Sequence, residues 1–66
     1  MQLTINGENR AFSGVADVAG LVAALGLDIR KVAVERNLEI VPRSAYQKTR
    51  IADGDRIEIV QFVGGG

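Results

Sequence analysis

Only one stretch of this chain repeats its apolar residues with the period of a helix, and this limits the fold more than any other feature. Four apolar residues recur at i, i+3, i+4 and i+7 and therefore share one side of an α-helix: Val18, Leu21, Val22 and Leu25. Asp17 stands where an N-cap carboxylate would accept a hydrogen bond from the first turn. One helix with one apolar stripe needs one sheet to cover it, so we expect a two-layer α+β domain.

The segment before the helix predicts a hairpin. Residues 2–5 alternate polar and apolar side chains, which is the period of a half-buried strand. Asn6-Gly7 follows, a dipeptide that readily adopts positive φ, and we expect the return strand at residues 9–13.

The segments after the helix predict the rest of the sheet. Residues 31–36 and 39–41 read as a second, shorter pair of strands. Residues 43–50 are irregular and polar, with Tyr46 expected to anchor them to the core. Residues 56–63 form the longest and most apolar strand, which should lie centrally and parallel to the first.

This order of elements indicates a β-grasp fold, a mixed sheet of four to five strands packed on one main helix. We expect residues 1–63 to form a single domain and residues 64–66 to form a flexible glycine tail.

The composition excludes several classes of function. The 66 residues include no His and no Cys, so the common general base, thiolate nucleophile and metal ligands are absent. Eight basic residues balance eight acidic ones, which argues against nucleic acid as a partner. No apolar run approaches the roughly 20 residues of a membrane span, and no secretory signal begins the chain. We expect a monomeric, cytoplasmic protein with no catalytic residues and no metal, and we interpret Asp53-Gly54-Asp55 as a turn.

The sequence ends in three glycines, Gly64, Gly65 and Gly66. Glycine has no Cβ, so such an end can enter a narrow channel of another enzyme and expose its terminal carboxylate. ATP could adenylate that carboxylate, and sulfur or an amine could then attack the mixed anhydride. A frayed end or a cloning remnant would also explain the glycines.

The last strand predicts a docking surface beside this tail. If Ile57 and Ile59 face the helix, Val60 and Phe62 lie on the open face of the sheet, next to Val63. Apolar residues exposed there would bind partner proteins. A strand covered on both sides is the alternative.

Taken together, the segments of this chain resemble the ThiS family, the sulfur carrier proteins of thiamin biosynthesis. Six features in this order carry the resemblance: Gln2 to Gly7, the helix stripe, Val32 to Asn37, Ile40 to Ser44, Asp53 to Asp55 and the glycine end. Two positions depart from the family pattern, since the family typically ends in two glycines and has a bulkier Trp where Tyr46 stands.

The resemblance implies a mechanism and partners. A ThiF-type adenylyltransferase would use ATP and Mg to adenylate Gly66. A cysteine desulfurase would supply sulfur, and the resulting thiocarboxylate would donate it to thiazole synthase. This chain would bind no cofactor itself and would be a protein co-substrate, not an enzyme.

Three other functions remain open at this point. The small subunit of molybdopterin synthase is a sulfur carrier with the same fold and a glycine end. A β-grasp module that binds proteins without covalent chemistry and a ubiquitin-like protein modifier are the other two.

Overall fold

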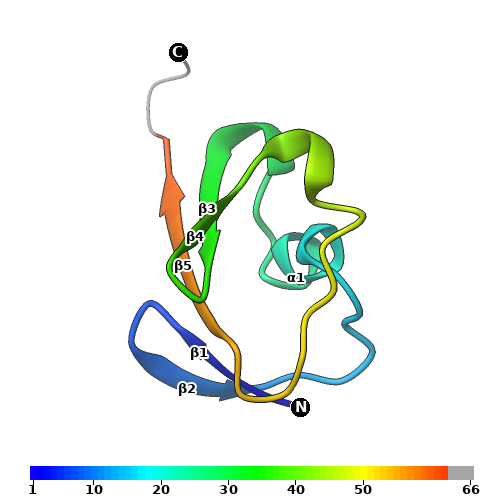
Figure 1. The fold of residues 1–66 in the computed structure, drawn as a ribbon, viewed down its shortest axis with the longest axis vertical. Coiled ribbons are helices and arrows are strands. Elements are labelled where there is room, and N and C mark those ends of the chain that lie inside the picture. Colours follow the sequence, from blue (N-terminus) through cyan, green and yellow to red (C-terminus); the bar gives the residue numbers. More distant parts are fainter. Residues whose placement is uncertain (63–66) are drawn as a thin grey trace.

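The computed structural model describes residues 1–62 and places a five-stranded sheet against one α-helix (Figure 1). The elements run in this order: β1 (Gln2–Ile5), β2 (Glu8–Ala11), α1 (Val18–Ala24), β3 (Val32–Arg36), β4 (Glu39–Val41) and β5 (Arg56–Gln61). Short 3-10 turns at Ile29–Lys31 and Arg43–Ala45 precede β3 and follow β4.

The strand order in the sheet is β2-β1-β5-β3-β4. β5 is central and runs parallel to β1, whereas β1–β2, β3–β4 and β3–β5 pair antiparallel. This arrangement confirms the predicted β-grasp fold and the central position of the last strand. The return strand of the first hairpin covers residues 8–11 instead of 9–13. Just beyond it, Phe12 still exchanges two hydrogen bonds with Met1: its amide donates to the Met1 carbonyl oxygen, and its carbonyl oxygen accepts from the Met1 N-terminus.

Helix α1 begins and ends as the sequence predicts. Asp17 is extended and its Oδ1 accepts a hydrogen bond of 2.7 Å from the Gly20 amide, which caps the first turn. Gly26 follows the helix with φ of 74°, a conformation that glycine adopts without steric strain. An added Cβ at Gly20 would lie 3.3 Å from Asp17 Oδ1, so the cap itself explains a glycine inside the helix.

The core lies between α1 and the sheet and is closed by the segment that connects β4 to β5. Twelve buried hydrophobic residues form one cluster: Leu3, Ile5, Val18, Leu21, Val22, Val32, Val34, Val41, Tyr46, Ile51, Ile57 and Ile59. The strand members alternate with exposed residues and the helix members follow the predicted stripe, except that Leu25 is only partly buried.

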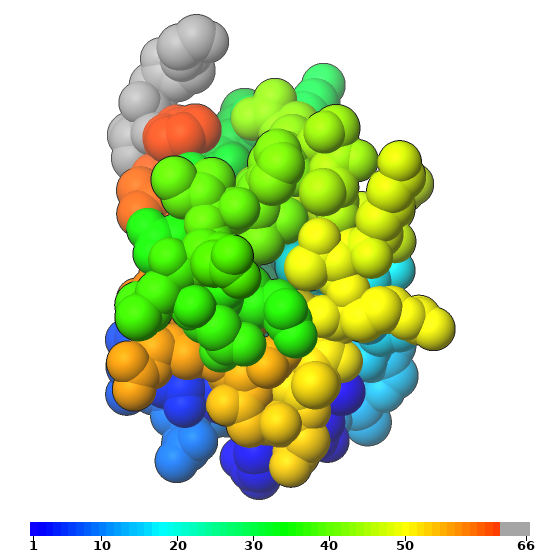
Figure 2. All heavy atoms as spheres, viewed as in Figure 1, coloured from blue at the N-terminus to red at the C-terminus, as the bar shows by residue number. Residues whose placement is uncertain are grey.

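The connecting segment packs over the helix (Figure 2), where its atoms, yellow in the view, partly cover those of α1. The Tyr46 hydroxyl donates to the Val32 carbonyl oxygen at 3.3 Å, which confirms Tyr46 as an anchor. The amides of Val18 and Ala19 donate to carbonyl oxygens of Thr49 and Tyr46, so this segment also satisfies the start of the helix.

One prediction falls partly outside this description. The division into a domain of residues 1–63 and a tail of residues 64–66 is not tested, because the structure describes residues 1–62. Within that range no helix is long and apolar enough to cross a membrane.

Candidate functional site

Strand β5 carries the chain through the centre of the sheet towards the predicted glycine tail. Ile57 and Ile59 are buried under the helix, whereas Val60 is 61% exposed and Phe62 is 50% exposed. Val60 and Phe62 are therefore exposed, as the strand alternation predicts, and their role in docking stays a prediction. Phe62 is the last described residue, and its amide donates to the Lys31 carbonyl oxygen at 2.7 Å.

The other residues predicted for the site lie outside the described part of the chain. Val63 was expected to extend the docking surface, and Gly64, Gly65 and Gly66 were expected to enter partner active sites. Their roles stay predictions.

The exposed apolar surface continues from β5 to the edge of the sheet. Residues that pair across strands share a face, and the register pairs Val60 with Ala33 and Glu35 with Ile40. Ile40 is 79% exposed. We call Ile40, Val60 and Phe62 the open-face patch.

The sequence analysis missed Ile40. Val41 next to it is buried and faces the helix, so the two-residue period of a strand already turns Ile40 outwards. That signal gives its exposure but not its neighbours. Only the order β5-β3-β4 brings Ile40 onto the same surface as Val60.

Two carboxylates lie in the middle of this surface. Glu35 on β3 pairs directly with Glu58 on β5, and both are partly exposed. Among residues 1–62 neither takes part in an ion pair; the two that occur are Arg30–Asp28 and Arg36–Asp55.

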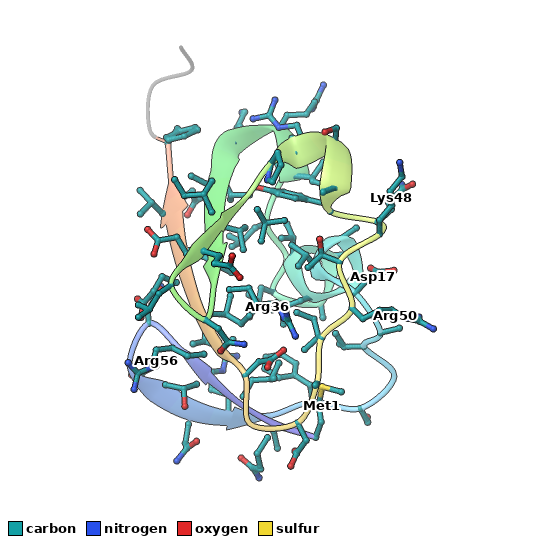
Figure 3. The ribbon with its side chains drawn as sticks, in the orientation of Figure 1. Met1, Asp17, Arg36, Lys48, Arg50 and Arg56 are labelled. Carbon is teal, nitrogen blue, oxygen red and sulfur yellow. The ribbon has the colours of Figure 1, made fainter. Side chains whose placement is uncertain are left out.

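A polar cluster around Asp55 holds the start of β5, on the face of the sheet opposite to the open-face patch. Asp55 is 7% exposed, and its carboxylate accepts hydrogen bonds from Arg36 Nε at 2.8 Å, Asn37 Nδ2 at 3.0 Å and the Ala52 amide at 2.8 Å. In Figure 3 Arg36 extends from β3 into the space between the sheet and the connecting segment. Burial alone would raise the pKa of Asp55, but these three hydrogen bonds and the charge of Arg36 hold the pKa below its ordinary value.

The Asp53-Gly54-Asp55 sequence forms a turn, as predicted. Gly54 has φ of 87°, and Asp53 Oδ1 accepts a hydrogen bond of 2.6 Å from the Gln2 amide. Both carboxylates are thus engaged in structure. No group of three or more potential metal ligands occurs among residues 1–62.

The remaining candidates also have structural contacts or lie exposed. Arg43 donates to the Arg30 carbonyl oxygen at 3.0 Å, which ties the loop after β4 to the turn before β3. A hollow of about 240 Å³ lies near the end of α1 and is lined by Leu25, Leu27 and Ile59, with Arg10 and Gln61.

A family model, a curated relative and a solved structure all match this chain to the same family. The model of the ThiS family matches residues 3–66. The chain is 38% identical over 65 residues to the sulfur carrier protein ThiS of Bacillus subtilis, covering 97% of this chain and 98% of that protein. The crystal structure of the thiamine biosynthesis protein ThiS from Geobacter metallireducens superposes with a TM-score of 0.85 at 38% identity, with both chains covered completely.

Two longer proteins are also similar. The chain is 59% identical over 66 residues to a thiazole synthase of Paramagnetospirillum magneticum and 39% identical to one of Magnetococcus marinus. In both cases the whole chain is matched but spans only 20% of the relative. A segment like this chain is therefore part of some thiazole synthase polypeptides.

Proposed function

This chain belongs to the ThiS family, and on that basis we propose that it carries sulfur for thiazole formation in thiamin biosynthesis. The observation that carries the proposal is the end-to-end match to the Bacillus sulfur carrier, which covers 97% of this chain and 98% of that protein. The family match favours this pathway over the molybdopterin synthase small subunit, which the sequence left open.

The proposed chemistry takes place at Gly66. Its carboxylate attacks the α-phosphorus of ATP and releases pyrophosphate, which forms an acyl-adenylate. The persulfide of the cysteine desulfurase displaces AMP and forms an acyl disulfide. A thiol then attacks the desulfurase sulfur of that S–S bond, which forms a mixed disulfide and releases the thiocarboxylate on Gly66. Gly64 and Gly65 carry no side chains, so the backbone can pass through a narrow channel to the reacting atoms.

The chain contributes recognition, and its partners contribute catalysis. It is a carrier and a protein co-substrate, as the family indicates, and not an enzyme. ATP and Mg would be bound by the activating enzyme. The open-face patch beside the end of β5 would hold the chain on its partners while Gly66 reacts.

The proposed partners have unequal support. The two thiazole synthases that contain a similar segment support thiazole synthase as the acceptor. A ThiF-type adenylyltransferase and a cysteine desulfurase follow from the sequence resemblance. We place these reactions in the cytoplasm and propose that the carrier is monomeric between encounters.

An intact-mass measurement tests this function. The chain is incubated with ATP·Mg, a ThiF-type enzyme, a cysteine desulfurase and cysteine, and its mass is compared before and after. We expect a mass increase equal to the exchange of one oxygen for sulfur, located at Gly66. A variant lacking Gly66 is the control and should remain unchanged although it folds normally.

Two results would contradict the proposal. One is no sulfur on the chain while the same enzymes modify a known ThiS carrier. The other is a protein that, isolated from its source, continues beyond Gly66 and is never cleaved there, because the mechanism requires a free carboxylate on this residue. Retained binding to partners without any modification would favour the non-covalent binding module.

A further inference from the structure

Two like charges face each other in the middle of the open face. Glu35 and Glu58 are direct partners in the antiparallel pair β3–β5. Like charges at such positions destabilise a sheet, and opposite charges or apolar pairs are the usual choice. The fold therefore keeps an unfavourable pair where many other residues would serve it better.

The surroundings of the pair increase this effect. The neighbouring pair on the same face is Val60 with Ala33, and Ile40 lies opposite Glu35 on β4. Arg56 lies two residues from Glu58 on β5 and shares its face, but among the described residues it forms no ion pair with either glutamate. Neither carboxylate is therefore neutralised by an ion pair within residues 1–62.

Asp55 shows that another carboxylate of this molecule is neutralised within the fold. Asp55 is buried and receives three hydrogen bonds, one of them from Arg36. Where folding requires a neutralised carboxylate, the chain supplies the donors itself. Within residues 1–62 neither Glu35 nor Glu58 receives a side-chain hydrogen bond or an ion pair, so a partner can supply them on binding.

We propose that the open face docks on a protein surface that presents an arginine or a lysine among apolar side chains, with the cation between Glu35 and Glu58. Ile40, Val60 and Phe62 then exclude water around the charged group. A guanidinium is the better match, because its planar set of donors can reach two carboxylates at once.

This inference rests on the proposed function and identifies the partner as thiazole synthase. Glu58 and Val60 lie on β5, Phe62 follows this strand directly, and the sequence continues from there to the predicted tail. Binding at this surface would fix the place where the tail leaves the carrier. Thiazole synthases that contain a similar segment indicate that the two proteins work side by side.

Binding of the double variant Glu35→Gln/Glu58→Gln to the thiazole synthase of the same source tests the inference. We expect binding to weaken by roughly 10- to 100-fold in titration calorimetry, because the cation of the partner no longer faces the two negative charges. The dependence of the dissociation constant on salt should also become smaller. Thermal stability should stay equal or rise, since the like-charge pair has been removed.

A second double variant, Glu8→Gln/Glu39→Gln, has the same change in net charge. Glu8 pairs with buried Ile5, and Glu39 pairs with Arg36, so both lie on the side of the sheet away from the patch. We expect it to bind as the unchanged protein does. Equal binding by the two double variants and the unchanged chain would overturn the inference.

The mass measurement separates this outcome from a failure of the proposed function. If the unchanged chain acquires sulfur on Gly66 but the glutamates do not affect binding to thiazole synthase, the function stands and the docking chemistry is wrong. If the unchanged chain never acquires sulfur, the function itself is wrong.

Discussion

The two hairpins of this molecule have turns of the same kind but different residues in them. The β1–β2 turn consists of Asn6 with φ of 49° and Gly7 with φ of 84°, and the β3–β4 turn consists of Asn37 with φ of 52° and Leu38 with φ of 71°. Two successive positive φ values are typical of the type I′ turn, whose twist suits a hairpin. Asn tolerates this conformation well, glycine without strain, and leucine only at a cost.

In both hairpins the asparagine also binds the central strand. Asn6 Oδ1 accepts from the Ile59 amide at 2.7 Å, and its Nδ2 donates to the Ile59 carbonyl oxygen at 3.1 Å. Asn37 Oδ1 accepts from the Arg56 amide at 2.9 Å. The two turns therefore hold β5 from either side, and this explains why asparagine occurs in both.

The second hairpin carries backbone strain at Leu38 that the first avoids with Gly7. Leu38 adopts a left-handed conformation and its side chain is 77% exposed, so it gains little from burial. It lies two residues from Ile40, at the end of the strand that completes the open face.

The comparison of the two turns is tested most strongly by removing their asparagine side chains, which we expect to change the free energy of unfolding more than the other substitutions do. Glycine keeps the backbone conformation and removes the hydrogen bonds; it also makes the unfolded chain more flexible, to the same extent in both variants. Asn37→Gly loses a bond to the Arg56 amide and a bond to the buried Asp55 carboxylate, and we expect a loss of about 2–3 kcal/mol in the free energy of unfolding. Asn6→Gly loses two neutral bonds and should cost about 1–2 kcal/mol.

Urea denaturation of the two variants and the unchanged chain measures these losses. The order of the two losses is the critical result. A larger loss for Asn6→Gly would show that the charged cluster under the second hairpin adds nothing to its turn.

A smaller effect of opposite sign is expected at Leu38. Leu38→Gly relieves the left-handed strain, which is worth about 1–2 kcal/mol, but makes the unfolded chain more flexible, so the net gain should be about 0.5–1 kcal/mol. Thermal unfolding should show a melting temperature higher by a few degrees. The matched variant Gly7→Leu should lower stability, since it introduces the same strain in the first hairpin. A loss of stability in Leu38→Gly would mean that the leucine packs usefully in the folded protein.

The smallest expected difference lies in how steeply stability falls on acidification. The pKa of Asp55 lies below its ordinary value of 3.8 in the folded protein, so the unfolded chain takes up this proton first as the pH falls. The stability contributed by the ionised carboxylate is complete above 3.8 and is lost as the pH falls through the folded pKa. Asp55→Asn should therefore show a shallower loss of stability between about pH 5 and pH 2. Equal slopes for the two proteins would exclude Asp55 as a source of acid sensitivity.

The local elements could be predicted from the sequence because their signals lie within a few residues. The stripe from Val18 to Leu25 gave the helix, Asn6-Gly7 gave the first turn, and the alternation around Ile57 gave the buried and exposed sides of β5. The exposure of Val60 and Phe62 followed from the same two-residue period.

Which residues share the open face could not be predicted in this way, because their neighbours depend on strand order and register. Glu35 and Glu58 are far apart in the sequence, and nothing local indicates that they are direct partners. Ile40 joins Val60 only because β3 lies between β4 and β5. The dual role of Asn6 and Asn37 was missed for the same reason, since a turn residue reveals its φ preference but not the strand beside it.

The sequence by itself determined the number of layers and the type of each main element, since burial of a single helical stripe permits few arrangements in 66 residues. It also indicated the family, through the resemblance of its segments to ThiS proteins. Only the tertiary structure decided which side chains share the open face and which carboxylate is neutralised within the fold. Pairing across a sheet joins residues that the backbone separates, and the charges and apolar groups on a face interact only once that pairing has formed.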